Sequence, residues 1–107
     1  MNKRHVKHDG KIEKKGLFTK KWRVDPITVK AADENEVVWS STETDFVVWF
    51  PPDWSPLVGL NQSGKTREFR ATVKDTVKPG TSYPYSIFCY HDYEMTESNS
   101  SPEMIIE

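Results

Sequence analysis

The chain of 107 residues contains one cysteine, so no disulfide can form within it and the fold cannot depend on one. It has no apolar run near the roughly 18 residues that a membrane-spanning helix needs. Its charged first residues also lack the apolar region of a secretory signal. We therefore expect a cytoplasmic protein from the sequence as written, and a periplasmic or secreted one if a leader was removed.

Apolar residues are scarce, at 36% of the chain, but aromatic residues are well represented, with four Trp, four Tyr and five Phe. A chain of this length suits one domain and buries about two thirds of the surface of its unfolded state. We therefore expect one domain with an aromatic core and a large polar surface.

Helical periodicity is lacking as well. Short runs rich in β-branched and aromatic residues occur at residues 27–30, 36–40 and 46–50, and apolar residues alternate with polar ones from Phe69 to Val73. Polar segments separate the first three runs, and a segment with Pro and Gly separates the third run from the fourth. The pattern predicts an all-β sandwich of about seven strands, the last of which runs through Met104–Ile106.

Positive charge is concentrated at the start of the chain. Residues 1–30 carry ten Lys and Arg against three acids, a net charge of +7, whereas residues 31–107 have a net charge of −8. Residues 1–11 are charged and show no periodicity, which predicts a flexible basic arm before a domain at residues 12–107. The basic region lacks the interleaved Arg and aromatic residues typical of nucleic-acid binding, so we favour a solubilising tail or an arm that folds back on the acidic body.

The last third of the chain carries the residues with metal-binding chemistry. Tyr83, Tyr85, Ile87 and Cys89 recur with a period of two, so in a strand they share one face. Beyond Cys89 the chain supplies an imidazole at His91 and a thioether at Met95. Thiolate and thioether are ligands that favour Cu(I), and imidazole binds copper in either state.

This run resembles the last two strands of the cupredoxins, small blue-copper sandwiches in which Cys, His and Met lie on one loop before a final apolar strand. Residues 27–39 and 40–50 are similar to earlier family segments, the second of which delivers the other copper-binding histidine. The resemblance covers residues 22–107 and implies a Greek-key sandwich. Asp45, or alternatively Phe46, stands where that histidine is expected, and His91 follows Cys89 by two residues, where the family usually has at least three.

The resemblance and its departures together lead to two functional hypotheses. The first is a non-catalytic binding or accessory domain that has lost the blue-copper site, with no cofactor expected. The alternative is a copper-binding or electron-transfer protein with a non-blue site, for which the candidate ligands are Cys89, His91, Met95 and Asp45. No histidine stands in a sequence context typical of a catalytic triad, so we do not expect an enzyme.

Two other segments carry recognisable patterns. Residues 59–66 match the phosphate-loop expression G-x-x-x-x-G-K-[ST], but the sequence after them alternates as a strand, which favours a turn over a nucleotide site. Trp49–Trp54 places two Trp and a Phe around a Pro-Pro pair. If exposed, these rings form a contact surface for an unknown protein partner; otherwise they cover the core.

Overall fold

The computed structural model describes residues 3–96 and 102–107, and within them the chain forms strands and no helix. The all-β prediction is confirmed. The strands are β1 (His5–Lys11), β2 (Glu13–Lys15), β3 (Lys21–Arg23), β4 (Ile27–Val29), β5 (Glu34–Ser40), β6 (Phe46–Trp49), β7 (Glu68–Thr72), β8 (Ser82–Pro84), β9 (Ser86–Cys89), β10 (Glu94–Met95) and β11 (Glu103–Ile106).

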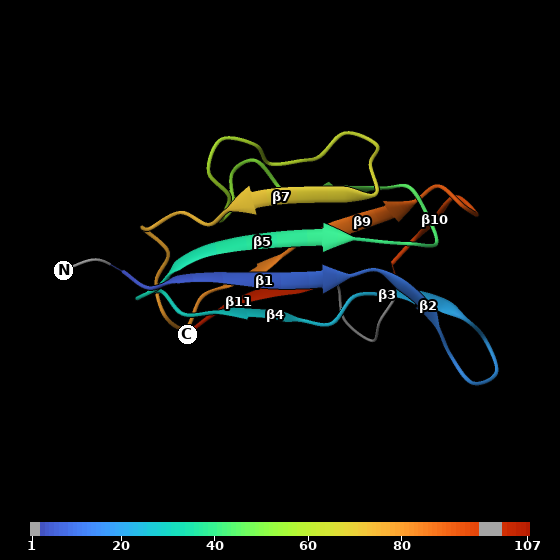
Figure 1. The fold of residues 1–107 in the computed structure, drawn as a ribbon, viewed down its shortest axis with the longest axis horizontal. Helices are drawn as coiled ribbons and strands as arrows, with labels where there is room; N and C mark the ends of the chain where they lie inside the picture. The colour runs from blue at the N-terminus through green and yellow to red at the C-terminus, as the bar shows by residue number, and fades with distance from the viewer. Residues whose placement is uncertain (1–2, 97–101) are drawn as a thin grey trace.

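Pairing joins strands that lie far apart in the chain. The sheets have the orders β1-β5-β7, β10-β9-β6, β4-β11-β8 and β2-β3. β1 runs parallel to β5 and β4 runs parallel to β11, whereas the other paired strands are antiparallel. Both termini lie at one end of the molecule, and the β2–β3 hairpin lies at the other end (Figure 1).

The core is shared between these sheets. In β6 alternation turns one set of side chains inward, so that Phe46 and Val48 are fully buried while Trp49 is exposed. Buried side chains from β4, β5, β6, β7, β9 and β11 form one cluster. Sheets that cover a common core in this way are consistent with the predicted sandwich.

Trp39 on β5 has a central position in this core. Its ring is fully buried and stacks on Phe69 of β7 at a centroid distance of 5.6 Å. Its indole Nε1 donates a hydrogen bond of 3.2 Å to the Tyr85 hydroxyl, so the polar atom of this buried ring is satisfied. Tyr85 in turn stacks on Phe50 at 4.6 Å. These contacts connect β5 and β7 with the chain around β6 and β9.

The number of strands differs from the prediction of about seven, in part because two longer runs are each interrupted by one residue. Tyr85 alone separates β8 from β9, and its amide bonds to Pro102 O at 3.0 Å. Ile12 alone separates β1 from β2. The described residues therefore form eleven short segments, while the strands predicted near residues 27–30, 36–40, 46–50 and 69–73, and the final strand, are confirmed.

The N-terminal segment also differs from the expectation of a flexible arm over residues 1–11. His5–Lys11 forms β1 and pairs along its whole length with β5, from His5 opposite Glu34 to Lys11 opposite Ser40. Pairing satisfies the backbone of this charged segment while its side chains mostly face solvent. The domain thus includes residues assigned to the arm, whereas residues 1 and 2, and residues 97–101 within the predicted domain, lie outside the described part.

Gly10 provides a test of how tightly β1 packs. A Cβ atom added there would lie 2.8 Å from Cδ1 of the fully buried Trp39. We expect Gly10→Ala to lower the free energy of unfolding by about 1–3 kcal/mol, because the indole has little room to move. Chemical denaturation measures this change.

Gly64→Ala is the matched control, because a Cβ atom at Gly64 would have nothing within 4 Å. Equal stability of the two variants would contradict the packing of Trp39 against β1.

Candidate functional site

Three segments meet at the end of the molecule that lies away from the termini. They are residues 41–45 between β5 and β6, residues 90–93 between β9 and β10, and residues 65–67 ahead of β7. Together they form a pocket of about 160 Å³, lined by Glu43, Thr44, Asp45, Lys65, Arg67, Tyr90, His91 and Tyr93.

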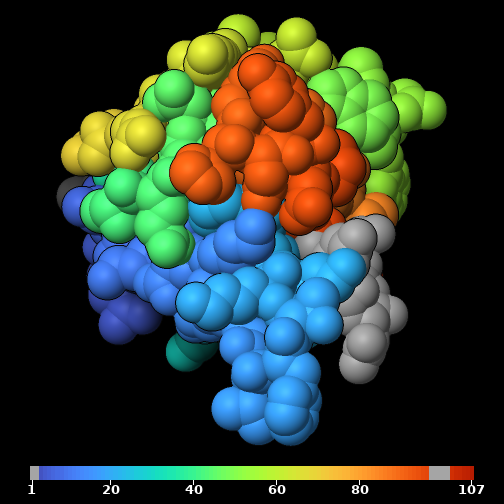
Figure 2. Space-filling view, turned by 90° about the vertical axis from the view of Figure 1, so that its right-hand side faces the viewer, coloured from blue at the N-terminus to red at the C-terminus, as the bar shows by residue number. Residues whose placement is uncertain are grey.

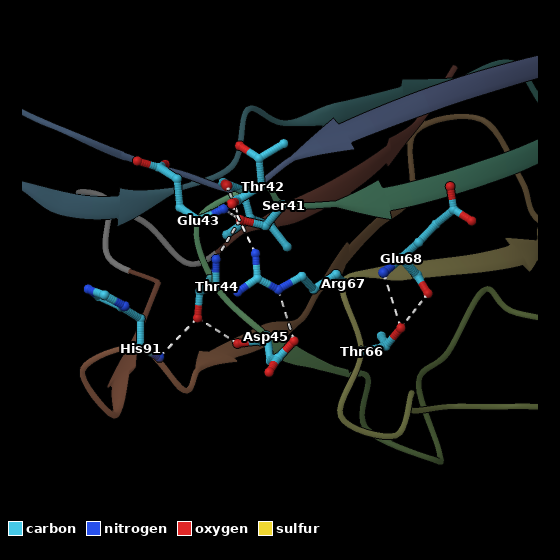
Figure 3. A network of polar contacts seen from close by, with 10 residues as sticks. Ser41, Thr42, Glu43, Thr44, Asp45, Thr66, Arg67, Glu68 and His91 are labelled. Carbon is cyan, nitrogen blue, oxygen red and sulfur yellow. Dashed lines mark hydrogen bonds and ion pairs between the residues drawn. The ribbon is translucent and has the colours of Figure 1, made fainter.

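Hydrogen bonds hold the first two segments together. Thr44 Oγ1 accepts a bond of 3.0 Å from the amide of His91 (Figure 3). The amide of Tyr90 donates to Asp45 O at 2.9 Å. Thr44 is buried, with 1% of its surface exposed. The backbone positions of Asp45 and His91 are therefore fixed relative to each other.

Arg67 pairs with Asp45, one of the two carboxylates of the pocket. Its Nε lies 3.1 Å from Asp45 Oδ1, and its Nη1 donates a bond of 2.9 Å to Thr42 O. One guanidinium thus connects the start of β7 with the loop before β6 (Figure 3). Asp45 is partly exposed, so this ion pair positions the side chain more than it stabilises the fold.

The four candidate metal ligands are only partly brought together. Asp45 and His91 line the same pocket, but Cys89 is fully buried in the core beside it. Met95 pairs with Phe88 across the β9–β10 hairpin, and neighbouring residues of a strand face opposite sides. Met95 therefore lies on the outer face of the sheet, where 46% of it is exposed, and Cys89 points the other way.

Burial strongly disfavours the charged form of Cys89. Desolvation, followed by the nearby carboxylates of Asp92 and Glu94, raises the pKa of this thiol to about 12, and the Lys14 ammonium opposes the shift only weakly. The thiolate is the form that binds metals and attacks electrophiles. At neutral pH this side chain is therefore an uncharged, apolar part of the core.

An ion pair fixes the loop after Cys89 to the β2–β3 hairpin. The Lys14 ammonium bonds to the Asp92 carboxylate, which also accepts a bond of 2.7 Å from Nε1 of the buried Trp22. The bond from Lys14 holds the pKa of Asp92 below its usual value and the pKa of Lys14 above its own. The Trp22 ring also meets His91 edge to face at 6.2 Å. The hairpin base thus supports the loop that carries His91.

Sequence reasoning did not include the two cations of the pocket among the site residues. Lys65 lies in the segment at residues 59–66 that matches a phosphate loop, and Arg67 directly follows this segment. The match was the only feature of the sequence that indicated a role for these two residues. In the structure the segment leads into β7, and Thr66 forms an antiparallel bridge with Phe46. The helix that a phosphate loop opens is replaced here by a strand. Lys65 Nζ lies over the Tyr90 ring, 4.7 Å from its centroid.

Comparison with protein-family models gives no match, and comparison with curated proteins gives none either. Within residues 3–96 and 102–107, no three His, Cys, Asp or Glu side chains are grouped so that they could hold a metal ion. The same residues contain no helix that is long and apolar enough to cross a membrane.

The buried state of Cys89 predicts slow chemistry at its thiol. Native protein should react with a thiol reagent at least about tenfold more slowly than unfolded protein, because the sulfur is reached only through an opening of the structure. Because burial raises its pKa to about 12, the thiolate form is nearly absent from the closed structure between about pH 7 and 9, so the reaction has to pass through the opened one. Absorbance of the released chromophore measures both rates.

A variant with Cys89→Ala and Leu60→Cys is the control, since it moves the single thiol to a residue that is 63% exposed. Native labelling of Cys89 as fast as that of this control would show that the thiol is accessible.

Proposed function

We propose that this chain is a non-catalytic, cupredoxin-like binding or accessory domain that has lost the blue-copper site. The observation that carries the proposal is the state of the two positions expected to bind copper. Cys89 is a buried thiol with a raised pKa, and Asp45, at the position of the expected histidine, pairs with Arg67. A blue centre needs a thiolate and two imidazoles, so this donor set does not fit it.

Two features support the cupredoxin-like part of the proposal. The resemblance implies that the segment around residues 45 and 46 lies beside the loop that begins at Cys89. In the structure Phe46 is the register partner of Cys89, and Asp45 O bonds to the amide of Tyr90. Greek-key connectivity belongs to the same proposal.

The non-catalytic part of the proposal rests on the fact that a substrate cannot reach the thiol of Cys89. A thiol is the strongest nucleophile that this chain contains, but this one is fully buried and uncharged. A substrate in the pocket would meet the exposed imidazole of His91 and the ion-paired Asp45 instead. These groups suit recognition of a polar ligand.

One observation favours the alternative of a non-blue copper site. Asp45 and His91 line the same pocket, and Cu(II) accepts both carboxylate and imidazole ligands. Binding there would compete with the Arg67 ion pair and would not involve the thiol of Cys89. Copper bound in this way would lack the intense colour of a copper–thiolate bond.

Titration with Cu(II) in air, followed by visible absorption, tests the proposal. The parent protein should not develop the intense blue colour of a type 1 centre, because its thiol is buried and only one imidazole is near. Weak binding without this colour, lost in His91→Ala, would support the alternative site. A blue parent protein would refute the loss of the blue-copper site.

Asp45→His tests the position of the missing ligand, with Glu43→His as a matched control on the same pocket. Blue colour in the first variant alone would support the family assignment. Colour in both variants would show that the position of the added imidazole is not specific.

The proposed protein-binding surface is the aromatic segment Trp49–Trp54. Phe50 points into the core, whereas Trp49 and Trp54 are 41% and 48% exposed. Trp54 is held in place because it stacks on Tyr83 at 4.9 Å and donates a bond from Nε1 to Ser82 O at 3.1 Å. Rigid, half-exposed Trp side chains of this kind are typical of interface hot spots.

We expect Trp54→Ser to weaken partner binding by about 2 kcal/mol or more, the usual loss at a hot spot, with little change in melting temperature. Affinity capture on the immobilised protein, followed by titration of the captured partner, measures the loss. Phe18→Ser, which removes an exposed ring elsewhere on the surface, is the control. Equal binding by the two variants would exclude this segment as the contact surface.

A further inference from the structure

The β2–β3 hairpin ends in two bulky apolar side chains that the rest of the protein leaves uncovered. Leu17 is 91% exposed and Phe18 is 96% exposed, the highest values among large apolar residues in the described part of the chain. The hairpin projects from the body of the molecule at the end opposite the termini (Figures 1 and 2). Exposed apolar residues gathered at one point indicate an interaction site.

The base of the hairpin is anchored, so its tip is presented in a defined direction. Trp22 on β3 is 1% exposed, and its Nε1 bonds to Asp92 at 2.7 Å. The turn itself is tight: Gly16 has φ +151°, and a Cβ atom there would lie 2.0 Å from Thr19 O. Glycine is therefore required at the start of the turn, and Leu17 and Phe18 occupy its outer side.

Cations surround this apolar tip. Residues 14–23 contain Lys14, Lys15, Lys20, Lys21 and Arg23 and no acid. Lys14, in the middle of β2, pairs with Asp92, and Lys15, the last residue of β2 before the turn, pairs with Glu13. A sequence in which Lys and Arg flank exposed Leu and Phe has the composition of segments that bind the surface of anionic membranes.

The shape of the tip distinguishes between possible occupants. A protein partner would need a pocket matched to a convex turn, whereas the interfacial layer of a bilayer is fluid and closes around it. Nucleic acid would use the charges and the Phe18 ring, but it would leave Leu17 exposed. Each strand of the hairpin has three residues, which span about 10 Å, a length comparable to the 5–10 Å depth of interfacial insertion.

We propose that the β2–β3 hairpin is a membrane-docking element for anionic bilayers. Leu17 and Phe18 insert at the boundary between headgroups and acyl chains, while the flanking cations contact the headgroups. Docking leaves the strands of the domain outside the bilayer. Trp22 of the hairpin contacts His91, so docking also brings the pocket that holds Asp45 and His91 close to the membrane surface.

Vesicle sedimentation tests this proposal on the full chain. The protein should sediment with phosphatidylcholine vesicles that contain phosphatidylserine and remain in solution with phosphatidylcholine alone. Added salt should weaken the binding, because it screens the attraction between Lys and anionic lipid. Equal binding to both vesicles, or no binding to either, would refute the proposal.

Variants separate the apolar from the electrostatic contribution. Leu17→Ser combined with Phe18→Ser should lower the partition coefficient by about tenfold or more, because both apolar side chains are lost. The control is Val58→Ser combined with Leu60→Ser, which removes two exposed apolar side chains elsewhere. Lys15→Gln with Lys20→Gln should also weaken binding, and Lys74→Gln with Lys78→Gln should not. The proposal fails if the hairpin variants bind as well as their controls.

Phe18→Trp gives a direct readout of insertion. Its emission should shift to the blue on addition of anionic vesicles and should be quenched by brominated acyl chains, whereas Leu60→Trp should show neither effect. Melting temperatures close to that of the parent show that the variants are folded. Binding to a single-stranded oligonucleotide in the absence of vesicle binding would instead assign the hairpin to nucleic acid.

Discussion

Trp39 lies against the backbone of Gly10 on one side and stacks on Phe69 at 5.6 Å on another. This packing requires that β1 have no side chain at that point, and it adds side-chain contact to the backbone pairing that joins β1, β5 and β7. The bond from its Nε1 to the Tyr85 hydroxyl extends the same packing to the segment before β9. Because the loops of the pocket follow β5 and β9, their positions depend on this contact.

The strands that could be predicted from the sequence are those whose own residues show a strand pattern. β6 and β7 combine β-branched or aromatic residues with alternation of exposure, a pattern that needs no knowledge of the partner strand. β1 has no such signal, since its inward positions include Gly10 and the half-buried His8. His8 Nε2 lies 2.9 Å from Oδ1 of the buried Asn35. This charged segment is a strand because it pairs in parallel with β5, which lies far along the chain. The periodicity of a single sequence does not indicate such a partner.

The candidate site could be predicted only in part, for a similar reason. Asp45 and His91 line one pocket because Asp45 directly precedes β6 and His91 follows β9, and these two strands, which have a local sequence signal, are paired. Met95 was separated from Cys89 by the β9–β10 hairpin, whose turn includes Tyr93 at the positive φ of 57°. Tyrosine rarely adopts this conformation, so no sequence rule indicates the turn. The Lys14–Asp92 ion pair spans 78 residues and depends wholly on the tertiary fold.

The burial of Cys89 determines how the domain responds to its redox environment. With one cysteine the domain has no internal cross-link to reduce, and a thiol that is fully buried offers no exposed sulfur for exchange with other proteins or glutathione. The domain therefore has the same disulfide state, with no bond formed, under reducing and oxidising conditions. A domain built in this way needs neither an oxidising compartment to fold nor a reducing one to remain free of intermolecular disulfides.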